Sequence, residues 1–252
     1  MSIRLRPLSR EELRGLDQRA ERESGIPTLL LMENAGRGAA SWLAELSGTT
    51  TVPIDRRMAD SDVLARPERP LPDVVVVCGP GNNGGDGGVV ARHLDSWGYP
   101  VQVIWLSGRE SLRGDAAIQA GILERSGLEQ IFWSEHQSCS SLDALEPILA
   151  RADWLVDGLF GTGLSRPLEG SSQALVERIN RSNKPILALD LPSGMDADTG
   201  RPLGATVKAT ATATFAAPKL GFSTPGAGEY TGKVAVIEIG LPRSLTAVFR
   251  DR

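Results

Sequence analysis

The sequence predicts an α/β fold whose mostly parallel sheet is covered by helices on both faces. From residue 73 onward, short apolar segments alternate with amphipathic ones, which is typical of such a sheet. A glycine-rich stretch at 79–87 follows the unbroken apolar run 74–78 and precedes a helical pattern. With 252 residues and 41% hydrophobic residues, the chain is long and apolar enough to bury a substantial core.

Two helices are expected before the first strand. A capping box at Ser9–Glu12 opens the first, and Gly25 closes it. The second runs over 28–46, after Pro27. Residues 49–72 contain four prolines and scattered charges, which indicates a long surface excursion, or else a linker between two domains. Two helices alone could not bury their apolar faces, so we expect them to pack on the same sheet, in one domain spanning 1–252.

The rest of the chain reads as alternating strands and helices. The expected strands are 73–78, 101–106, 128–133, 154–157, 185–190, 210–215 and 234–239. The expected helices between the first five strands lie near 88–97, 113–126, 142–152 and 172–182. The stretch 206–217 is ambiguous, because its Thr-Ala alternation favours a strand whereas its small residues could pack elsewhere.

Polar residues gather directly after three strands, in the loops 79–86, 157–167 and 190–194. Ligands of open α/β sheets bind beyond the carboxyl ends of the strands, where the strand order reverses. If the order is 3-2-1-4-5, the first and fourth strands flank that point. The glycine loop and the loop after Asp157 would then face each other, with Asp190 beside them.

These loops carry ligand groups of two kinds. The first kind is a low-charge oxygen site made of Asp157, the amides of Asn82 and Asn83, and the Ser193 hydroxyl. Such a site suits potassium better than zinc, which prefers nitrogen and sulfur ligands. The alternative is that Asp157 is an ordinary turn residue at the end of a strand. Backbone N–H groups of Gly161–Gly163, with Arg166, suit phosphate or ribose, although an ordinary loop with a solvated arginine is the alternative.

Asp190 is the strongest candidate for proton chemistry. It ends the most apolar strand, and a carboxyl group in a dry environment can act as a general acid–base, although an Asx-turn is the simpler interpretation. Lys219 could reach the same edge of the sheet, but a lone lysine is more often a surface charge. Asp196 and Asp198 are expected to be solvated, and His93 and His136 receive no role.

Several function classes are disfavoured. The net charge of −4 without a basic stripe argues against nucleic acid. The N-terminus lacks the apolar core of a signal peptide and no apolar run is long enough to span a bilayer, so we expect a cytoplasmic protein without a membrane partner. Two features argue against a nicotinamide dehydrogenase. The second strand ends without an acidic residue to bind the ribose, and Asp86 would repel a pyrophosphate at the start of the following helix.

Together the motifs resemble the YjeF N-terminal domain family, and the resemblance covers nearly the whole chain. The motifs that carry it are Leu31–Gly36, Gly79–Gly87, Val156–Leu164, Asp190–Asp196, Ala217–Lys219 and Ile239–Pro242. This family's enzymes are NAD(P)H-hydrate epimerases. The resemblance implies a Rossmann-like three-layer α/β/α sandwich, often a homodimer. It also implies a hydrated NADH or NADPH substrate, and a separate dehydratase as functional partner.

The resemblance also implies roles by position. Asn83, Asp157 and Ser193 match the potassium ligands, and Asp190 matches best as the acid–base group. The matched substrate contacts are Asn82, Asn83, Gly84, Gly85, Asp86, Gly161, Thr162, Gly163, Leu164, Ser165, Arg166, Pro167 and Asp190. Gly158 stands where alanine is more usual, and the excursion at 49–72 is longer than expected.

The resulting hypothesis is epimerisation of the hydrate. Asp190 would protonate the departing hydroxyl while the ring nitrogen pushes it out, and water would return to the opposite face of the iminium; reversible ring opening is an alternative. The same fold also occurs as a non-catalytic interaction module, but intact Asp157, Asp190 and Ser193 argue for an enzyme.

Overall fold

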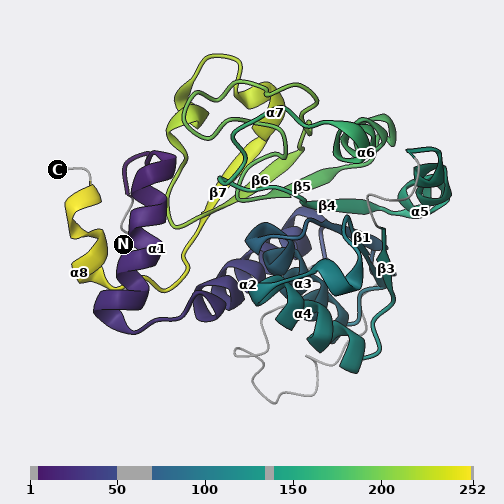
Figure 1. Cartoon of the computed structure of the whole chain (residues 1–252), viewed down its shortest axis with the longest axis horizontal. Coiled ribbons are helices and arrows are strands. Elements are labelled where there is room, and N and C mark those ends of the chain that lie inside the picture. Colours follow the sequence, from purple (N-terminus) through teal and green to yellow (C-terminus); the bar gives the residue numbers. More distant parts are fainter. Residues whose placement is uncertain (1–4, 50–69, 134–138, 251–252) are drawn as a thin grey trace.

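A parallel sheet of seven strands forms the centre of the structure, a computed structural model that describes residues 5–49, 70–133 and 139–250 (Figure 1). The strand order is β3-β2-β1-β4-β5-β6-β7, and every paired strand is parallel. The strands are β1 (Val74–Cys78), β2 (Val101–Trp105), β3 (Gln130–Phe132), β4 (Trp154–Gly158), β5 (Ile186–Leu189), β6 (Ala211–Phe215) and β7 (Lys233–Ile237). The order reverses between β1 and β4, as the sequence predicted.

Helices cover both faces of this sheet, which confirms the three-layer prediction. The longer helices are α1 (Arg10–Ser24), α2 (Thr28–Leu46), α3 (Asn82–Ser96), α4 (Gly114–Arg125), α5 (Glu146–Arg151) and α6 (Gly170–Arg181). In Figure 1, α2, α3 and α4 lie on one side of the sheet and α5 and α6 on the other. The short helices are α7 (Gly228–Thr231) and α8 (Arg243–Thr246), and α8 packs beside α1.

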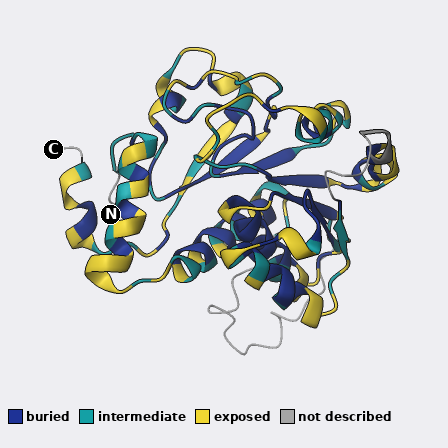
Figure 2. Ribbon diagram, in the orientation of Figure 1, coloured by how far each residue is buried: buried dark blue, intermediate teal, exposed yellow. Residues whose placement is uncertain are grey.

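The core divides into two large apolar clusters, one on each face of the sheet. Alternate residues of β1 supply them: Val74 and Val76 belong to the cluster under α2, α3 and α4, whereas Val75 and Val77 belong to the cluster under α5 and α6. Every residue of β1 and β4 is therefore buried, which is why these strands read as continuous apolar runs (Figure 2). Leu13, Leu16 and Ala20 place α1 in the first cluster, as expected for a helix sharing the same core.

Most predicted elements are confirmed, including the first helix. The Ser9 hydroxyl accepts from the Glu12 N–H at 3.2 Å, while Glu12 Oε2 accepts from the Ser9 N–H at 2.9 Å. Gly25 closes the helix at φ 64°, in the left-handed region. The ambiguous stretch at 206–217 contains the strand β6. Most of the predicted excursion at 49–72 lies outside the described residues.

The start of α3 was predicted wrongly. The helix begins at Asn82 rather than Gly88, so the glycine motif is helical rather than a loop. Its glycines serve close packing. A Cβ added to Gly84 would lie 1.8 Å from the Gly79 carbonyl oxygen. Tertiary packing therefore overrides the poor helix propensity of glycine, which a reading of local propensity misses.

Candidate functional site

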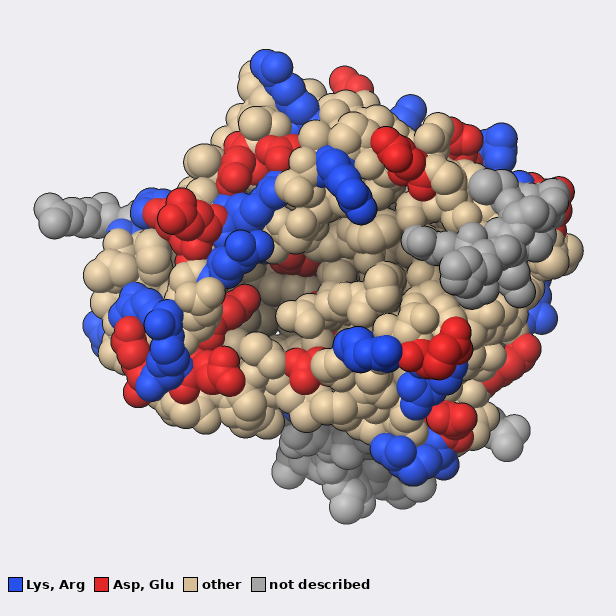
Figure 3. Space-filling model, viewed as in Figure 1, with Lys and Arg blue, Asp and Glu red and all other residues tan. Residues whose placement is uncertain are grey.

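A cavity of about 600 Å³ opens at the carboxyl ends of the central strands. Its walls come from α1, α2, the start of α3, the loop after β4, and the segments that follow β5 and β6. In the space-filling view this face of the molecule is hollowed near its centre, and acidic side-chain atoms are visible inside (Figure 3). This is the edge of the sheet where the sequence predicted a ligand.

The loops after β1 and β4 touch each other at this edge. The Gly79 N–H donates to the Gly158 carbonyl at 3.0 Å, and Val77 pairs in register with Asp157. A Cβ on Gly79 would lie 1.9 Å from the Leu159 carbonyl oxygen, so only glycine permits this approach. The predicted convergence of the glycine motif with the loop after Asp157 is confirmed.

Asp157 and Ser193 form a buried polar pair beneath the cavity. Asp157 Oδ1 accepts from the Ser193 hydroxyl at 2.7 Å and from the Leu159 N–H at 3.2 Å, while Oδ2 accepts from the Ser193 N–H at 2.8 Å. Burial raises the pKa of Asp157 to about 6, and the hydrogen bonds from Ser193 partly oppose this rise. Among residues 5–49, 70–133 and 139–250, no side chain forms an ion pair with Asp157, so a carboxylate here would be stabilised by a bound cation.

Asn83 lies close to this pair and is unsatisfied. Asn83 is 7% exposed, and neither its Oδ1 nor its Nδ2 has a hydrogen-bond partner within the described part of the chain. Asn83 packs between Gly158 and Gly161, since a Cβ on Gly158 would lie 3.0 Å from its carbonyl and one on Gly161 would lie 3.5 Å from its Cβ. A buried amide without a partner normally indicates an absent ligand or water. The donor set is made of neutral oxygens and one carboxylate, which fits a monovalent hard cation.

Asp190 and Lys219 form a charged pair at the cavity wall. Lys219 Nζ contacts Asp190 Oδ1 and also donates to the Phe215 carbonyl at 3.2 Å. Lys219 is 1% exposed, so the surface-charge interpretation was wrong and the alternative, that Lys219 reaches this edge of the sheet, is confirmed. Leu8 holds the segment around Lys219 in place, because its N–H donates to the Pro218 carbonyl and its own carbonyl accepts from the Leu220 N–H. Asp190 has φ 67°, an uncommon left-handed conformation for a non-glycine residue.

Two further carboxyl groups line the same cavity. Asp86 extends from α3 and is 8% exposed, whereas Asp17 extends from α1 and is an exposed residue. Burial, reinforced by the Asp190 charge, raises the pKa of Asp86 well above its usual range and that of Asp17 to about 6; Lys219 opposes both shifts. The cavity therefore contains a paired carboxylate beside carboxyl groups that tend to hold protons.

The chain matches the family model described as YjeF-related protein N-terminus over residues 28–221. The protein belongs to this YjeF family. It is 39% identical over 247 residues, covering 98% of this chain and 89% of the relative, to "NAD(P)H-hydrate epimerase" of Rhodopirellula baltica. It is 37% identical to the protein of the same name in Pirellula staleyi, over 94% of this chain and 93% of that relative.

Other YjeF relatives are longer. The "Bifunctional NAD(P)H-hydrate repair enzyme Nnr" of Moorella thermoacetica is 37% identical over 94% of this chain, which spans only 41% of that relative. Among solved structures, the crystal structure of yeast ynu0 has a TM-score of 0.73 and 24% identity, covering 97% of this chain and 93% of that one. That likeness shows the shared fold.

The residues matched to the YjeF family motifs separate into two groups in the structure. Those that line the cavity are Asn82, Asn83, Asp86, Gly161, Thr162, Gly163, Leu164 and Asp190. Gly84 and Gly85 are buried within α3 instead, and Ser165, Arg166 and Pro167 are exposed outside the cavity wall. The hypothesis that Arg166 contacts a ligand therefore receives no support from the cavity geometry.

The contribution of α1 to the cavity was missed from the sequence. Leu13, Arg14, Asp17, Gln18 and Glu21 line it, although α1 precedes the region that the YjeF family model matches. The helical period identified the buried face of α1, but nothing local to Asp17 indicates that its exposed side faces a cavity wall.

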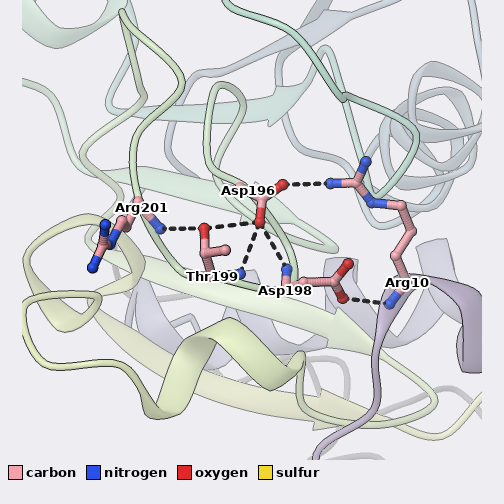
Figure 4. A network of polar contacts seen from close by, with 5 residues as sticks. All are labelled: Arg10, Asp196, Asp198, Thr199 and Arg201. Carbon is pink, nitrogen blue, oxygen red and sulfur yellow. Dashed lines mark hydrogen bonds and ion pairs between the residues drawn. The ribbon is translucent and has the colours of Figure 1, made fainter.

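A polar network ties α1 to the loop after β5 (Figure 4). The Arg10 guanidinium pairs with Asp196 Oδ2 at 2.7 Å, and the Arg10 N–H donates to Asp198 Oδ1 at 2.7 Å. Thr199 donates to Asp196 through both its N–H and its hydroxyl, at 2.8 Å. The prediction that Asp196 and Asp198 are merely solvated was wrong. His93 pairs with Glu33 at 2.7 Å outside the cavity lining, while His136 lies outside the described residues.

Proposed function

We propose that this protein is an NAD(P)H-hydrate epimerase, an isomerase that interconverts the R and S forms of hydrated NADH and NADPH. The names of its YjeF relatives support this activity. The observation that carries it is the Asp190–Lys219 pair, which faces a cavity at the strand-order reversal beside the glycine motif. Such a cavity is the usual nucleotide site of an open α/β sheet.

The substrate would lie along the rim formed by the start of α3 and the loop after β4. Asn82 and Thr162 offer polar groups there, and the first N–H groups of α3 suit a phosphate. Burial favours the neutral form of Asp86, which removes the repulsion expected from the sequence. The ring would sit deeper, against Asp190 and Lys219. Its hydroxyl-bearing carbon is next to the ring nitrogen, so protonation of that hydroxyl lets water leave and forms an iminium. Asp190 would exchange the proton with the oxygen on one face of the ring.

We further propose that a potassium ion binds between Asn83, Asp157 and Ser193. The unsatisfied Asn83 Oδ1 and the buried Asp157 carboxyl group support this assignment. A bound ion would supply positive charge and hold the glycine motif against the loop after β4. Its role is organisation, and Asp190 remains responsible for proton transfer.

The potassium proposal has a test that is independent of activity. Potassium chloride should raise the thermal midpoint relative to choline chloride at equal ionic strength. At about a hundredfold excess over the dissociation constant, binding contributes about 2.7 kcal/mol. Asp157→Asn should abolish this potassium effect, whereas Asp153→Asn, at the opposite end of β4, should retain it. A midpoint indifferent to potassium in the unmodified protein would contradict the proposal.

The activity itself is tested by a coupled assay. The protein is added to the R hydrate together with a dehydratase that consumes only the S form. Faster consumption is expected with the unmodified protein, and Asp190→Asn should lose this activity while keeping its thermal unfolding transition. No change on adding the protein would indicate a non-catalytic binding module instead.

Partner and location proposals follow from this activity. A separate NAD(P)H-hydrate dehydratase would consume the S hydrate, and we expect a cytoplasmic homodimer, which light scattering and cell fractionation would test. Within the described residues, no helix is long and apolar enough to cross a membrane.

A further inference from the structure

Asp86 is a second buried carboxyl group positioned to exchange protons in the cavity. It lies on α3 within the glycine motif, and both Asp86 and Asp190 line the same cavity. Asp190 is paired with Lys219, but no hydrogen bond or ion pair to the Asp86 carboxyl group is found within 5–49, 70–133 and 139–250. A buried carboxyl group without a charged partner is stabilised in its neutral form.

An epimerase that acts through an iminium needs a proton donor and a proton acceptor on opposite faces of the ring. The hydroxyl must be protonated on the face from which it departs. Water must then lose a proton on the face where it adds. A side chain positioned against one face of a bound ring does not reach the other within hydrogen-bond distance. Asp190 alone therefore accounts for only half of the reaction.

We propose that Asp86 is the acid–base group for one face of the nicotinamide ring and that Asp190 serves the other. This inference rests on the proposed epimerase function. Neutral Asp86 gives its proton to the departing hydroxyl, the C–O bond breaks, and the nitrogen lone pair forms the C=N bond. Water then adds to the opposite face, forming a new C–O bond and giving its proton to the Asp190 carboxylate. The reverse reaction exchanges the two roles, and solvent returns the enzyme to its starting protonation state.

The charges around Asp86 agree with this division. Asp17 on α1, Asp115 on α4 and Asp190 directly after β5 lie near it, and their negative charges favour its neutral form. Lys219 opposes them from the segment after β6, while the Cys78 thiol lies beneath it on β1. Asp190 has the ammonium group of Lys219 beside it. In the direction in which the hydroxyl leaves on the Asp86 face, Asp86 therefore begins as the acid and Asp190 as the base.

Oxygen exchange with the solvent distinguishes the role of Asp86 from that of Asp190. Purified R or S hydrate of NADH is incubated with the full-length protein in ¹⁸O-labelled water with potassium. Mass spectrometry measures label in each epimer and chromatography measures epimerisation. Unmodified protein should do both. Asp86→Asn should lose about 100-fold or more of the exchange from one epimer only, whereas Asp190→Asn should lose it from the other. Each variant should lose epimerisation.

The outcomes distinguish this inference from the proposed function. If the unmodified protein neither exchanges nor epimerises, the proposed function fails. If it is active but Asp86→Asn exchanges both epimers normally, or both variants lose the same epimer, the assignment of opposite faces is wrong. Unfolding by denaturant checks that each variant is folded. Asp115→Asn, which removes a nearby charge outside the cavity lining, is the matched control and should retain exchange from both epimers.

The pH dependence of the exchange rate provides a further test, because it would not change if Asp86 had only a structural role. Exchange from the epimer served by Asp86 should decline at alkaline pH, where the donor loses its proton. Asp17→Asn removes a neighbouring negative charge, so it should move this decline to lower pH. An unchanged alkaline limb in Asp17→Asn would contradict Asp86 as the donor.

Discussion

Lys219 carries its charge inside the protein, beside the Asp190 carboxylate and the Phe215 carbonyl. A buried pair stabilises little relative to apolar residues, but removing one partner leaves the other without compensation. Its value is therefore positional, because the ammonium group fixes both the orientation and the charge of Asp190.

Lys219→Met should lower the free energy of unfolding by about 3 kcal/mol, because it leaves the largely buried Asp190 carboxylate without its cation. Urea denaturation at pH 7.5 measures this loss. The double variant Lys219→Met with Asp190→Asn removes both charges and should recover part of the stability. A single variant as stable as the unmodified protein would show that Asp190 does not need this cation.

The sequence located the anionic half of this pair, and it placed Lys219 within reach of the same edge of the sheet without predicting that Lys219 is buried and paired. Asp157 and Asp190 were recognisable because each ends an apolar strand, and parallel strands bring their carboxyl ends to one edge. The burial of Lys219 and the position of Asp17 at the cavity were not predictable, because these environments depend on contacts with distant segments. Leu8 and α1 supply those contacts.

At the level of elements, the glycine motif is a packing device. Gly84→Ala should destabilise the protein by about 3 kcal/mol or more, because the new methyl group would lie 1.8 Å from the Gly79 carbonyl oxygen and the backbone must move. Gly81→Ala is the control, since its Cβ meets nothing within 4 Å, and it should change stability by less than about 1 kcal/mol. Chemical denaturation compares them. Equal effects would mean that the close approach does not limit this helix.

The connection of α1 to the loop after β5 makes a second prediction. Arg10→Ala removes the partly buried pair with Asp196 and should cost about 1–2 kcal/mol, whereas Arg19→Ala breaks only an exposed pair with Glu23 and should cost less than about 0.5 kcal/mol. Denaturant midpoints provide the comparison. Because α1 forms a cavity wall, Arg10→Ala should also raise KM for the hydrate, and an unchanged KM would separate this helix from binding.

Across the whole molecule, the layering followed from the sequence because alternation of apolar strands with helices restricts the topology, and the order 3-2-1-4-5 assumed for the first five strands is the observed one. The boundaries of the individual helices and strands were predicted less accurately. The start of α3 depends on packing against α2 and the sheet rather than on propensity, and β3 (Gln130–Phe132) is shorter than its apolar pattern.

The unusual carboxyl groups also shape stability against pH. Asp86 and Asp17 have raised pKa values in the folded state, that of Asp17 being about 6, so between about pH 4 and 6 the folded protein binds more protons than the unfolded chain. Their contribution to stability therefore falls as pH rises through this window. Below about pH 4.5, Glu12 acts oppositely, because its hydrogen bond with Arg6 lowers its pKa to about 2.

Calorimetry in potassium buffers should accordingly find a higher thermal midpoint at pH 5 than at pH 7.5, mainly through the buried Asp86, because solvent screens the exposed Asp17. Asp86→Asn removes one titrating group and should reduce this difference. Asp95→Asn, on the last turn of α3 and away from the cavity, should leave it unchanged. A midpoint that rises steadily from pH 5 to 7.5 would contradict the raised pKa values.

The left-handed backbone of Asp190 has a counterpart at Ala216, whose φ is 62° and which lies where the chain leaves β6 toward Lys219. Both ends of the charged pair thus depend on corners that an L-residue adopts at a cost of about 1 kcal/mol each. Glycine at position 216 would relax one corner, yet it would also free the segment to swing. The two bends therefore add backbone stiffness to the ion pair, and together they hold the Asp190 carboxyl group beside the Lys219 ammonium group.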